Sequence, residues 1–531
     1  MSYKIVIPSA GIGARIGPYS KFMNKALVTV GDKPAISRVI DKFANEISIV
    51  ILKGYKGDMV EEVVKALHPD RNIEFIEVDK YEGTGSGLGY SLLQAKDALQ
   101  CPFIFIPNDT LVGDDNIDIN PESYGNWAAY YEKQQGDLYN PEIFRTLELD
   151  KSKANVVNIL GKGTLNKNIY IGTCGVKDYQ VFWSSLSDSE AIEVGEVYGL
   201  NRLSSLKALK VNQWYDCGSL TNLSKAKQVY ENKDHNILEK EDESIWFTED
   251  QVIKFSVDQS FIRDRVKRVD YLPPKLLPEL ISSGDYTYKY LKEKGSVIAD
   301  ELTPVLMEKL LNECQTELWS HTSELSDENI NTCYDFYKEK TYKRIDHYLS
   351  RFEQFDHSHI TNGKKTESVK DLLATLDWKK LCGHPHWSKF HGDFHGENIL
   401  YSKKSGFCLL DWRQNFGEGN YKSGDAYYDF AKLNHGLIVN HGIVNNNQFT
   451  IKEDPVKTIF ISIDQKSNLI DCQTYFFKWL KQNGYDPDKV KLLTALIFLN
   501  ICGLHEFPYA RYLYLLGQFM LQEYLDLDKK E

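Results

Sequence analysis

Short apolar runs alternate with stretches of helical periodicity over the first 230 residues. Between residues 33 and 45, apolar residues recur at i, i+3, i+4 and i+7, which predicts one amphipathic helix. Strand-like runs occupy residues 4–8, 47–53, 73–78, 103–107 and 169–176. Because strands that alternate with helices bury their apolar faces against one another, this part of the chain is predicted to be a layered α/β domain.

The pattern changes after residue 243. Two β-type runs, 244–247 and 252–255, flank a short polar turn and predict a hairpin. Farther on, residues 301–348 and 476–527 have helical periodicity, whereas residues 357–368 and 440–454 are predicted to be loops.

A charge-rich segment lies between the two patterns, at residues 231–235 and 239–243. Such a run is typical of a solvated linker. We therefore predict an N-terminal domain at residues 1–232, a linker at 233–243 and a second domain at 244–531.

The second domain carries a group of residues with the spacing that phosphoryl transfer needs. In His391-Gly392-Asp393, the Asp precedes Asn398 by five residues, and Asp411 follows that Asn after thirteen. One carboxylate can accept the proton of an attacking hydroxyl, while an amide oxygen and a second carboxylate can hold Mg²⁺ on the phosphates of ATP. The apolar runs between Asn398 and Asp411 predict a hairpin that would bring these two residues to one end.

These residues resemble the signature of the aminoglycoside phosphotransferase and choline kinase family, a small-molecule branch of the protein-kinase-like fold. The resemblance implies a bilobal α+β domain, with a small lobe at about 244–300 and a helical lobe at about 301–531. It also implies that Asp393 is the catalytic base, that Asn398 and Asp411 bind Mg²⁺, and that Lys254 binds ATP, since it follows two β-branched residues as the family's strand lysine does. Residues 236–243 contain no glycine, so the family's glycine-rich lid is absent or altered.

At the N-terminus, a glycine-containing loop follows the first strand directly. A backbone with few side chains can approach a triphosphate closely, and Ala10, Gly11 and Gly13 lie in that loop. Arg15 follows, and Lys25 stands in the sequence Asn24-Lys25-Ala26-Leu27.

The wider pattern resembles the nucleotidyltransferases that make NDP-sugars and CDP-choline, whose signature is Gly-x-Gly-x-Arg and then Pro-Lys-x-Leu; here Asn24 replaces the proline. The resemblance implies a Rossmann-like fold in which Arg15 and Lys25 supply positive charge to the joining phosphates. Its other matches, with their implied roles, are Ala10, Gly11, Gly13, Gly83 and Thr84 for the nucleotide, Asp109 and Asp216 for Mg²⁺, and Glu196 for the second substrate.

Composition narrows the class of protein. The 531 residues carry a net charge of −12 with no basic stripe, which argues against a nucleic-acid partner. No apolar run is long enough for membrane insertion, and nine scattered cysteines without a Cys-x-x-Cys motif indicate a reduced, cytoplasmic protein. The oligomeric state stays open.

The two chemistries suggest one bifunctional enzyme that uses Mg²⁺ in both sites. A kinase would phosphorylate a small hydroxyl compound with ATP, most simply a sugar at its anomeric position. A nucleotidyltransferase would then couple that phosphate to CTP, UTP or GTP, giving a precursor for surface polysaccharide. One alternative is a choline, ethanolamine or polyol kinase joined to a CTP-dependent cytidylyltransferase. Another is a nucleotide-sensing protein with one inactive module.

Overall fold

A computed structural model describes residues 3–528 except 18, 138, 231–240, 300, 323, 418–419 and 455–457. The chain forms two compact units: the N-terminal unit, Met1–Ile262 with Ile281–Tyr290, and the C-terminal unit, Arg263–Leu280 with Leu291–Glu531. Residues 244–262 and 281–290 therefore pack with the first 230 residues, although the sequence assigned them to the second domain. Most of the predicted linker, 233–243, lies outside the described residues.

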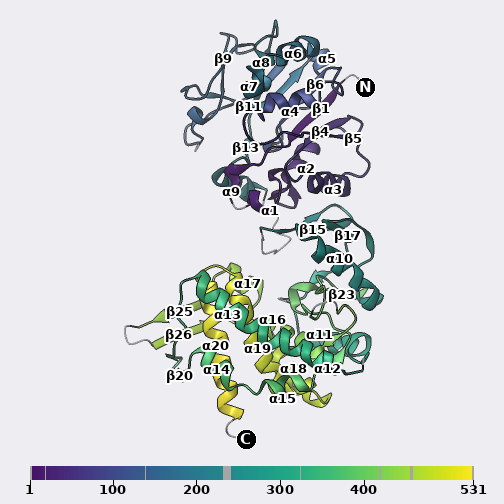
Figure 1. The fold of residues 1–531 in the computed structure, drawn as a ribbon, viewed down its shortest axis with the longest axis vertical. Helices are drawn as coiled ribbons and strands as arrows, with labels where there is room; N and C mark the ends of the chain where they lie inside the picture. Colours follow the sequence, from purple (N-terminus) through teal and green to yellow (C-terminus); the bar gives the residue numbers. More distant parts are fainter. Residues whose placement is uncertain are drawn as a thin grey trace. The chain divides into compact units, whose positions relative to one another are not determined.

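The N-terminal unit is built on a nine-stranded mixed sheet (Figure 1). Its central strands are parallel: β1 pairs with β4 on one side and β6 on the other, and β4 pairs with β5. Next to β6, strand β11 is antiparallel. The main path of the sheet consists of β10 (Val156–Leu160), β9 (Thr146–Leu149), β11 (Asn168–Val176), β6 (Phe103–Phe105), β1 (Lys4–Ser9), β4 (Ile49–Lys53) and β5 (Ile73–Glu77), while β8 (Trp127–Glu132) joins β11 to β12 (Lys207–Val211). The sheet confirms the α/β prediction and the five predicted strands.

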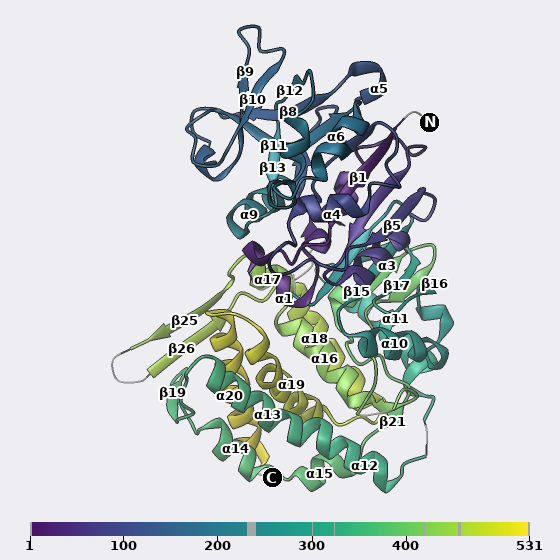
Figure 2. The ribbon, with the colours of Figure 1, turned by 45° about the horizontal axis from the view of Figure 1, so that its top comes forward.

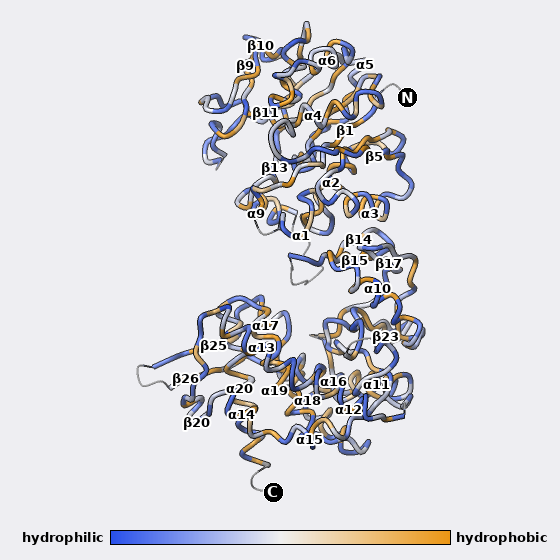
Figure 3. Tube along the Cα trace, viewed as in Figure 1, coloured by the Kyte–Doolittle hydropathy of each residue, from blue (hydrophilic) through white to orange (hydrophobic). Residues whose placement is uncertain are grey.

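Helices cover the sheet, and strand β1 between them is strongly apolar (Figure 3). They include α2 (Ala35–Ile40), α3 (Gly57–Leu67), α4 (Leu88–Gln94), α6 (Tyr179–Leu186), α7 (Ala191–Val194), α8 (Glu196–Leu200) and α9 (Leu220–Val229). The helix predicted at 33–45 is shorter than expected. Its first two residues form strand β3 (Lys33–Pro34), and the chain turns after Ile40, although Phe43 remains buried.

A separate four-stranded sheet belongs mainly to the N-terminal unit. Its order is β14 (Glu243–Phe247), β15 (Gln251–Ser256), β17 (Thr287–Leu291) and β16 (Leu280–Ser283), which confirms the predicted hairpin at its start. Trp246 is fully buried and donates a hydrogen bond of 2.9 Å to the Thr29 hydroxyl. Glu62 of α3 accepts a hydrogen bond of 2.7 Å from Thr287. Trp246 and Phe255 thus share one hydrophobic core with the large sheet.

The C-terminal unit is mostly helical. Helix α16 packs against α18 and α19, and Figure 2 shows these helices side by side. The long elements are α11 (Pro304–Cys314), α13 (Lys340–Arg351), α16 (Ala426–Ile438), α18 (Ser467–Gln482), α19 (Pro487–Ile501) and α20 (Tyr509–Asp528), with shorter helices α12 (Asp327–Cys333), α14 (Val369–Thr375) and α15 (Trp378–Gly383). Helical structure is confirmed in both predicted regions. Among the described residues, no helix combines the length and low polarity needed to span a membrane.

Two segments predicted to be loops contain regular structure instead. Within 357–368, strands β19 (His359–Thr361) and β20 (Lys364–Thr366) form a hairpin across Asn362-Gly363, both of which have positive φ. Asn-Gly is a strong signal for such a turn, because it tolerates positive φ at both central positions. Within 440–454, the chain forms helix α17 (His441–Asn445) and strand β25 (Phe449–Glu453), which pairs with β26 (Thr458–Ile463).

Candidate active sites

Strand pairing brings the two predicted metal-binding aspartates of the N-terminal unit together. Strands β7 (Thr110–Val112) and β13 (Trp214–Asp216) are antiparallel, with Asp216 opposite Thr110. Asp109 directly precedes β7, and its carbonyl accepts a hydrogen bond of 2.8 Å from the backbone N–H of Cys217. The two aspartates, 107 residues apart in sequence, therefore occupy adjacent positions.

Gly218 marks the point at which the charged side chains converge. A Cβ atom on this glycine would lie 2.9 Å from both Asp109 Oδ2 and Asp216 Oδ1, and 3.2 Å from Arg15 Nη2. Asp216 Oδ1 also accepts a hydrogen bond of 2.9 Å from the Gly218 N–H. Two carboxylates and a guanidinium group thus face the same small volume, which any side chain at position 218 would crowd.

Lys25 completes this cluster and is held by its neighbours. Its Nζ lies 2.8 Å from Asp109 Oδ2. Gly13, with φ of 72°, packs against it so closely that a Cβ there would lie 3.0 Å from Lys25 Cβ. Four of the predicted residues, Arg15, Lys25, Asp109 and Asp216, are therefore brought together, and Gly13 supports them.

Asn24, which replaces the proline of the resembled signature, is fully buried and caps the N-terminal end of the short 3₁₀ helix Lys25–Leu27. Its φ of −67° is an angle that proline also adopts, so the backbone path is compatible with either residue. Its side-chain oxygen accepts from the N–H of Ala26 at 2.9 Å, and its amide donates to the carbonyls of Ser9 (2.8 Å) and Tyr55 (2.6 Å). Asn24 thus ties the turn that carries Lys25 to the ends of β1 and β4.

The two aspartates have opposite pKa shifts. Burial would raise the pKa of the Asp109 carboxyl, but the charges of Lys25 and Arg15 outweigh it and the pKa falls below its usual value. For Asp216, burial and the neighbouring charge of Asp109 raise the pKa, although Asn222 donates it a hydrogen bond of 2.7 Å. A cation between them would relieve this repulsion, and carboxylate oxygens are ligands that Mg²⁺ prefers. The site therefore fits a magnesium ion.

The remaining predicted residues of this unit lie outside the four-residue cluster. Ala10 is buried, and its carbonyl accepts from the Tyr55 N–H at 2.9 Å; Gly11 is exposed and has no atom within 4 Å of an added Cβ. Gly83 and Thr84 form an exposed turn before α4. Glu196 is buried near Arg145, at 3.9 Å, and burial raises the pKa of its carboxyl.

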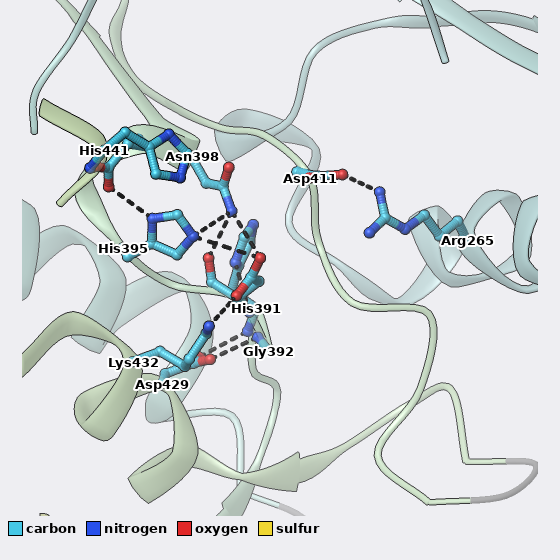
Figure 4. A network of polar contacts seen from close by, with 11 residues as sticks. Arg265, His391, Gly392, His395, Asn398, Asp411, Asp429, Lys432 and His441 are labelled. Carbon is cyan, nitrogen blue, oxygen red and sulfur yellow. Dashed lines mark hydrogen bonds and ion pairs between the residues drawn. The ribbon is translucent and has the colours of Figure 1, made fainter. Parts of the chain in front are cut away.

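In the C-terminal unit, Asp393 is the centre of a polar network, and Figure 4 labels its partners Lys432, Asn398 and His395. Its Oδ1 lies 2.7 Å from Lys432 Nζ on α16, and its Oδ2 accepts from the Asn398 amide at 3.1 Å and lies 3.5 Å from His395 Nε2. Partial burial would raise the pKa of the Asp393 carboxyl. The charges of Lys432 and His395 outweigh this effect and hold the pKa well below its usual range.

Buried groups fix the loop that carries Asp393. Asp429 accepts from the N–H groups of His391 (2.7 Å) and Gly392 (2.6 Å), and from the indole of Trp319 at 3.1 Å. Burial raises the pKa of Asp429 to about 6. On the other side, the fully buried Arg268 donates to the carbonyl of His391 at 3.0 Å. The backbone around Asp393 is thus held from both sides.

The predicted hairpin after Asn398 is confirmed. Strands β22 (Ile399–Ser402) and β23 (Gly406–Leu409) pair antiparallel, and the Leu410 N–H donates to the Asn398 carbonyl at 2.7 Å. The side chains, however, have separate partners. The Asn398 amide faces Asp393, whereas Asp411, with φ of 57°, forms an ion pair with Arg265 (Figure 4). Lys254 is buried in β15, opposite Ile245, and belongs to the N-terminal unit.

Several residues of this network were not identified from the sequence. Lys432 and Arg265 lie far from Asp393 and Asp411 along the chain, on helices whose partners a single sequence does not reveal. A usable signal existed for Lys432, because it follows Asp429 by three residues in a helix and so lies on the same face. His395, two residues after Asp393, could have been weighed as its ion-pair partner.

Comparisons with known proteins bear on the N-terminal part of the chain. No family model matches. The bifunctional protein GlmU of Methanococcus aeolicus is 25% identical over 229 residues, which are 42% of this chain and 53% of that protein. UTP–glucose-1-phosphate uridylyltransferase 2 of Staphylococcus saprophyticus is 23% identical over 270 residues, 44% of this chain and 93% of that protein. The chain thus spans about half the length of the first of these relatives.

A solved structure, CTP:phosphocholine cytidylyltransferase from Streptococcus pneumoniae, is 20% identical and covers 44% of this chain and 100% of its own, with a TM-score of 0.35. The matches to the two curated relatives show that the N-terminal part of this chain is similar in sequence to nucleotidyltransferases. The kinase-like architecture of the C-terminal unit stays a prediction.

Proposed function

We propose that this chain is a bifunctional enzyme. Its C-terminal site phosphorylates a small hydroxyl compound with ATP, most simply a sugar at its anomeric position. Its N-terminal site then couples that phosphate to a nucleoside triphosphate and releases pyrophosphate. The product would be a nucleotide-activated precursor of a surface polysaccharide.

The convergence of Asp109, Asp216 and Arg15 on Gly218 carries the N-terminal part of this proposal. When a phosphate monoester attacks the α-phosphorus of a nucleoside triphosphate, two anions must meet, so the site must supply positive charge. Arg15 and Lys25 supply two fixed charges. Asp109 and Asp216 would hold Mg²⁺, which neutralises phosphate charge when bound. A general base is unnecessary, since a phosphate monoester has a second pKa of about 6 and is already ionised.

The contacts of Asp393 support the kinase part. Its low pKa keeps the carboxylate ionised at neutral pH, so that it can orient the acceptor hydroxyl and take its proton late in the reaction. Lys432 and His395 hold the carboxylate in place. Asn398 and Asp411 would hold Mg²⁺ on the ATP phosphates. For this role Asp411 must exchange its present partner, Arg265.

The two activities form a sequence, because a kinase makes the phosphomonoester that a nucleotidyltransferase consumes. The substrates would be small molecules: ATP, a second nucleotide (CTP, UTP or GTP) and the acceptor. A mass-spectrometric screen of the purified full chain with Mg²⁺, the nucleotides and a pool of sugars, amino alcohols and polyols tests this. We expect a new nucleotide-linked product that requires ATP.

Two variants assign the steps. Asp393→Asn should abolish ADP formation, while pyrophosphate formation from a supplied sugar phosphate remains. Asp109→Asn should have the opposite effect. If the parent protein forms neither ADP nor pyrophosphate with any acceptor yet binds nucleotide, the alternative of a nucleotide-sensing protein would replace this proposal.

A further inference from the structure

A group of positively charged side chains gathers beside Asp393. Lys340 and Arg344 lie one turn apart on α13, and Arg413 follows Asp411 by two residues. Arg344 is half-buried, and burial together with the nearby charge of Arg413 lowers its pKa. Arg413 is fixed next to the catalytic loop: its N–H donates to the His391 carbonyl at 3.0 Å, and a Cβ on Gly392 would lie 2.5 Å from Arg413 Cβ. Lys432 is the fourth member, at 2.7 Å from Asp393.

Aromatic rings contact two members of this cluster, Lys340 and Arg413. Lys340 Nζ lies 4.2 Å from the centre of the Phe336 ring and 5.8 Å from that of Tyr428. The Arg413 guanidinium carbon lies 4.9 Å from the same Phe336 ring. The rings of Phe336 and Tyr428 are 4.9 Å apart. Two cations from different elements therefore pack on one aromatic surface, next to the loop that carries Asp393.

The cluster carries more positive than negative charge. Asp393 is already paired with Lys432. Within the described part of the chain, neither Lys340 nor Arg344 forms an ion pair with a carboxylate, and the side chain of Arg413 donates to the carbonyl of Asn415 at 3.0 Å. Burial, with the charges of Arg413 and Arg344 nearby, holds the pKa of Lys340 well below its usual range. Gathering half-buried like charges costs free energy unless an anion neutralises them.

We propose that the acceptor, whose hydroxyl proton passes to Asp393, carries a negatively charged group besides that hydroxyl. This group is a carboxylate or a phosphate, and Lys340, Arg344 and Arg413 bind it. This inference rests on the proposed kinase function and names its substrate class. The acceptor oxygen bonds to the γ-phosphorus of ATP, the bond from that phosphorus to the bridging oxygen breaks, ADP leaves with the electron pair, and the hydroxyl proton passes to Asp393. A choline or ethanolamine acceptor is disfavoured, since its cation would be repelled.

Steady-state kinetics of the full chain test the substrate class. ADP formation is measured with neutral sugars and polyols, amino alcohols, hydroxy acids and sugar or polyol phosphates. We expect turnover with hydroxy acids or with the phosphates, and the comparison of these two arms identifies the anionic group. Arg344→Gln should raise KM for that acceptor about tenfold or more and leave KM for ATP unchanged. The matched control is Lys343→Gln, an exposed neighbour on the same helix, which should change neither.

Thermal unfolding gives a readout that does not need turnover. In sodium chloride, Arg344→Gln should unfold at a higher temperature than the parent, because one unpaired like charge has been removed. Sodium phosphate at equal ionic strength should stabilise the parent more than Arg344→Gln. Equal stabilisation of both proteins by phosphate overturns the inference, as does efficient turnover of a neutral or cationic acceptor, or a rise in KM for ATP alone. A different combination of results would refute the kinase proposal but not the anion site. In that case phosphate stabilises the parent but not Arg344→Gln, and no acceptor yields ADP.

Discussion

The two candidate sites differ in how they hold their acidic residues. In the N-terminal unit, Asp109 is paired with Lys25 but also faces Asp216 beside Gly218, and the pKa of Asp216 is raised by burial and by this neighbour. In the C-terminal unit, each acid has its own cation: Asp393 is paired with Lys432, and Asp411 with Arg265. We infer that the first site offers one carboxylate, Asp216, to a divalent cation before substrate arrives, whereas both acids of the proposed kinase site would have to exchange ion pairs if ATP binds there.

The largest expected effect concerns the converging carboxylates. Asp216→Asn should lower pyrophosphate formation about 10³-fold, because a metal contributes several kcal/mol to transition-state charge stabilisation and each 1.36 kcal/mol is tenfold in rate. ADP formation should be unaffected. A coupled pyrophosphate assay measures the loss, with the exposed Asp70→Asn as control. Retention of pyrophosphate formation in Asp216→Asn would mean that the paired carboxylates are structural.

Loss of the cation that pairs with Asp393 should have a smaller effect. Lys432→Met removes the ammonium that positions Asp393, and we expect kcat for ADP formation to fall about 10²-fold, as misplacement by about 1 Å does. KM for ATP should change little. Because the pKa of Asp393 rises without its partner, the acidic limb of the pH–rate profile should move to higher pH. The exposed Lys379→Met is the control; an unmoved pH profile would show that Lys432 does not act through Asp393.

A smaller effect tests the support beneath Lys25. Asn24→Ala removes three hydrogen bonds of a fully buried side chain and leaves the carbonyls of Ser9 and Tyr55 without this donor. The N-terminal unit should lose about 1–3 kcal/mol of unfolding free energy, measured in urea. Asn201→Ala, at an exposed position, serves as the reference. A loss no larger than that of the reference variant would show that the hydrogen bonds of Asn24 do not stabilise the turn that carries Lys25.

The smallest effects are pH dependences of opposite sign. Burial lowers the pKa of His68, in the N-terminal unit, from 6.5 to about 4, so its contribution is present above pH 6.5 and is lost as pH falls through about 4. Burial also opposes the charge of His395, but Asp393 and Glu397 raise its pKa from 6.5 to about 9. Its contribution is therefore present below pH 6.5 and is lost as pH rises through about 9. The stability differences of His68→Gln and His395→Gln from the parent, followed across pH, should vary in opposite directions. Parallel curves would contradict the assignment.

The same comparison shows what a sequence can predict. Local signals succeeded for the periodicity of the strands and for the hairpin after Asn398. Arg15, Lys25, Asp109 and Asp216 were named from short motifs, and the structure brings these four side chains together, while their roles stay predictions. The side-chain partners of Asp393 and Asp411 were not predicted from the sequence. Arg265 and Lys432 lie on helices whose packing against the loop that carries Asp393 depends on tertiary structure. The spacing of Asp429 and Lys432 indicates only that these two residues share one helix face. The hairpin at Asn362-Gly363 was also missed, but it could have been predicted, because Asn-Gly is a strong turn signal and stands in the sequence.

The small sheet that begins at β14 has a practical consequence for anyone dividing this protein. A gene cut at the charged segment, before residue 244, would remove Trp246, Ile253 and Phe255 from the hydrophobic core that they share with the large sheet. Loss of one buried tryptophan side chain alone costs about 3–5 kcal/mol. The shorter fragment would then expose apolar surface and tend to aggregate. An N-terminal fragment that keeps these strands, through residue 290, should be the better behaved of the two.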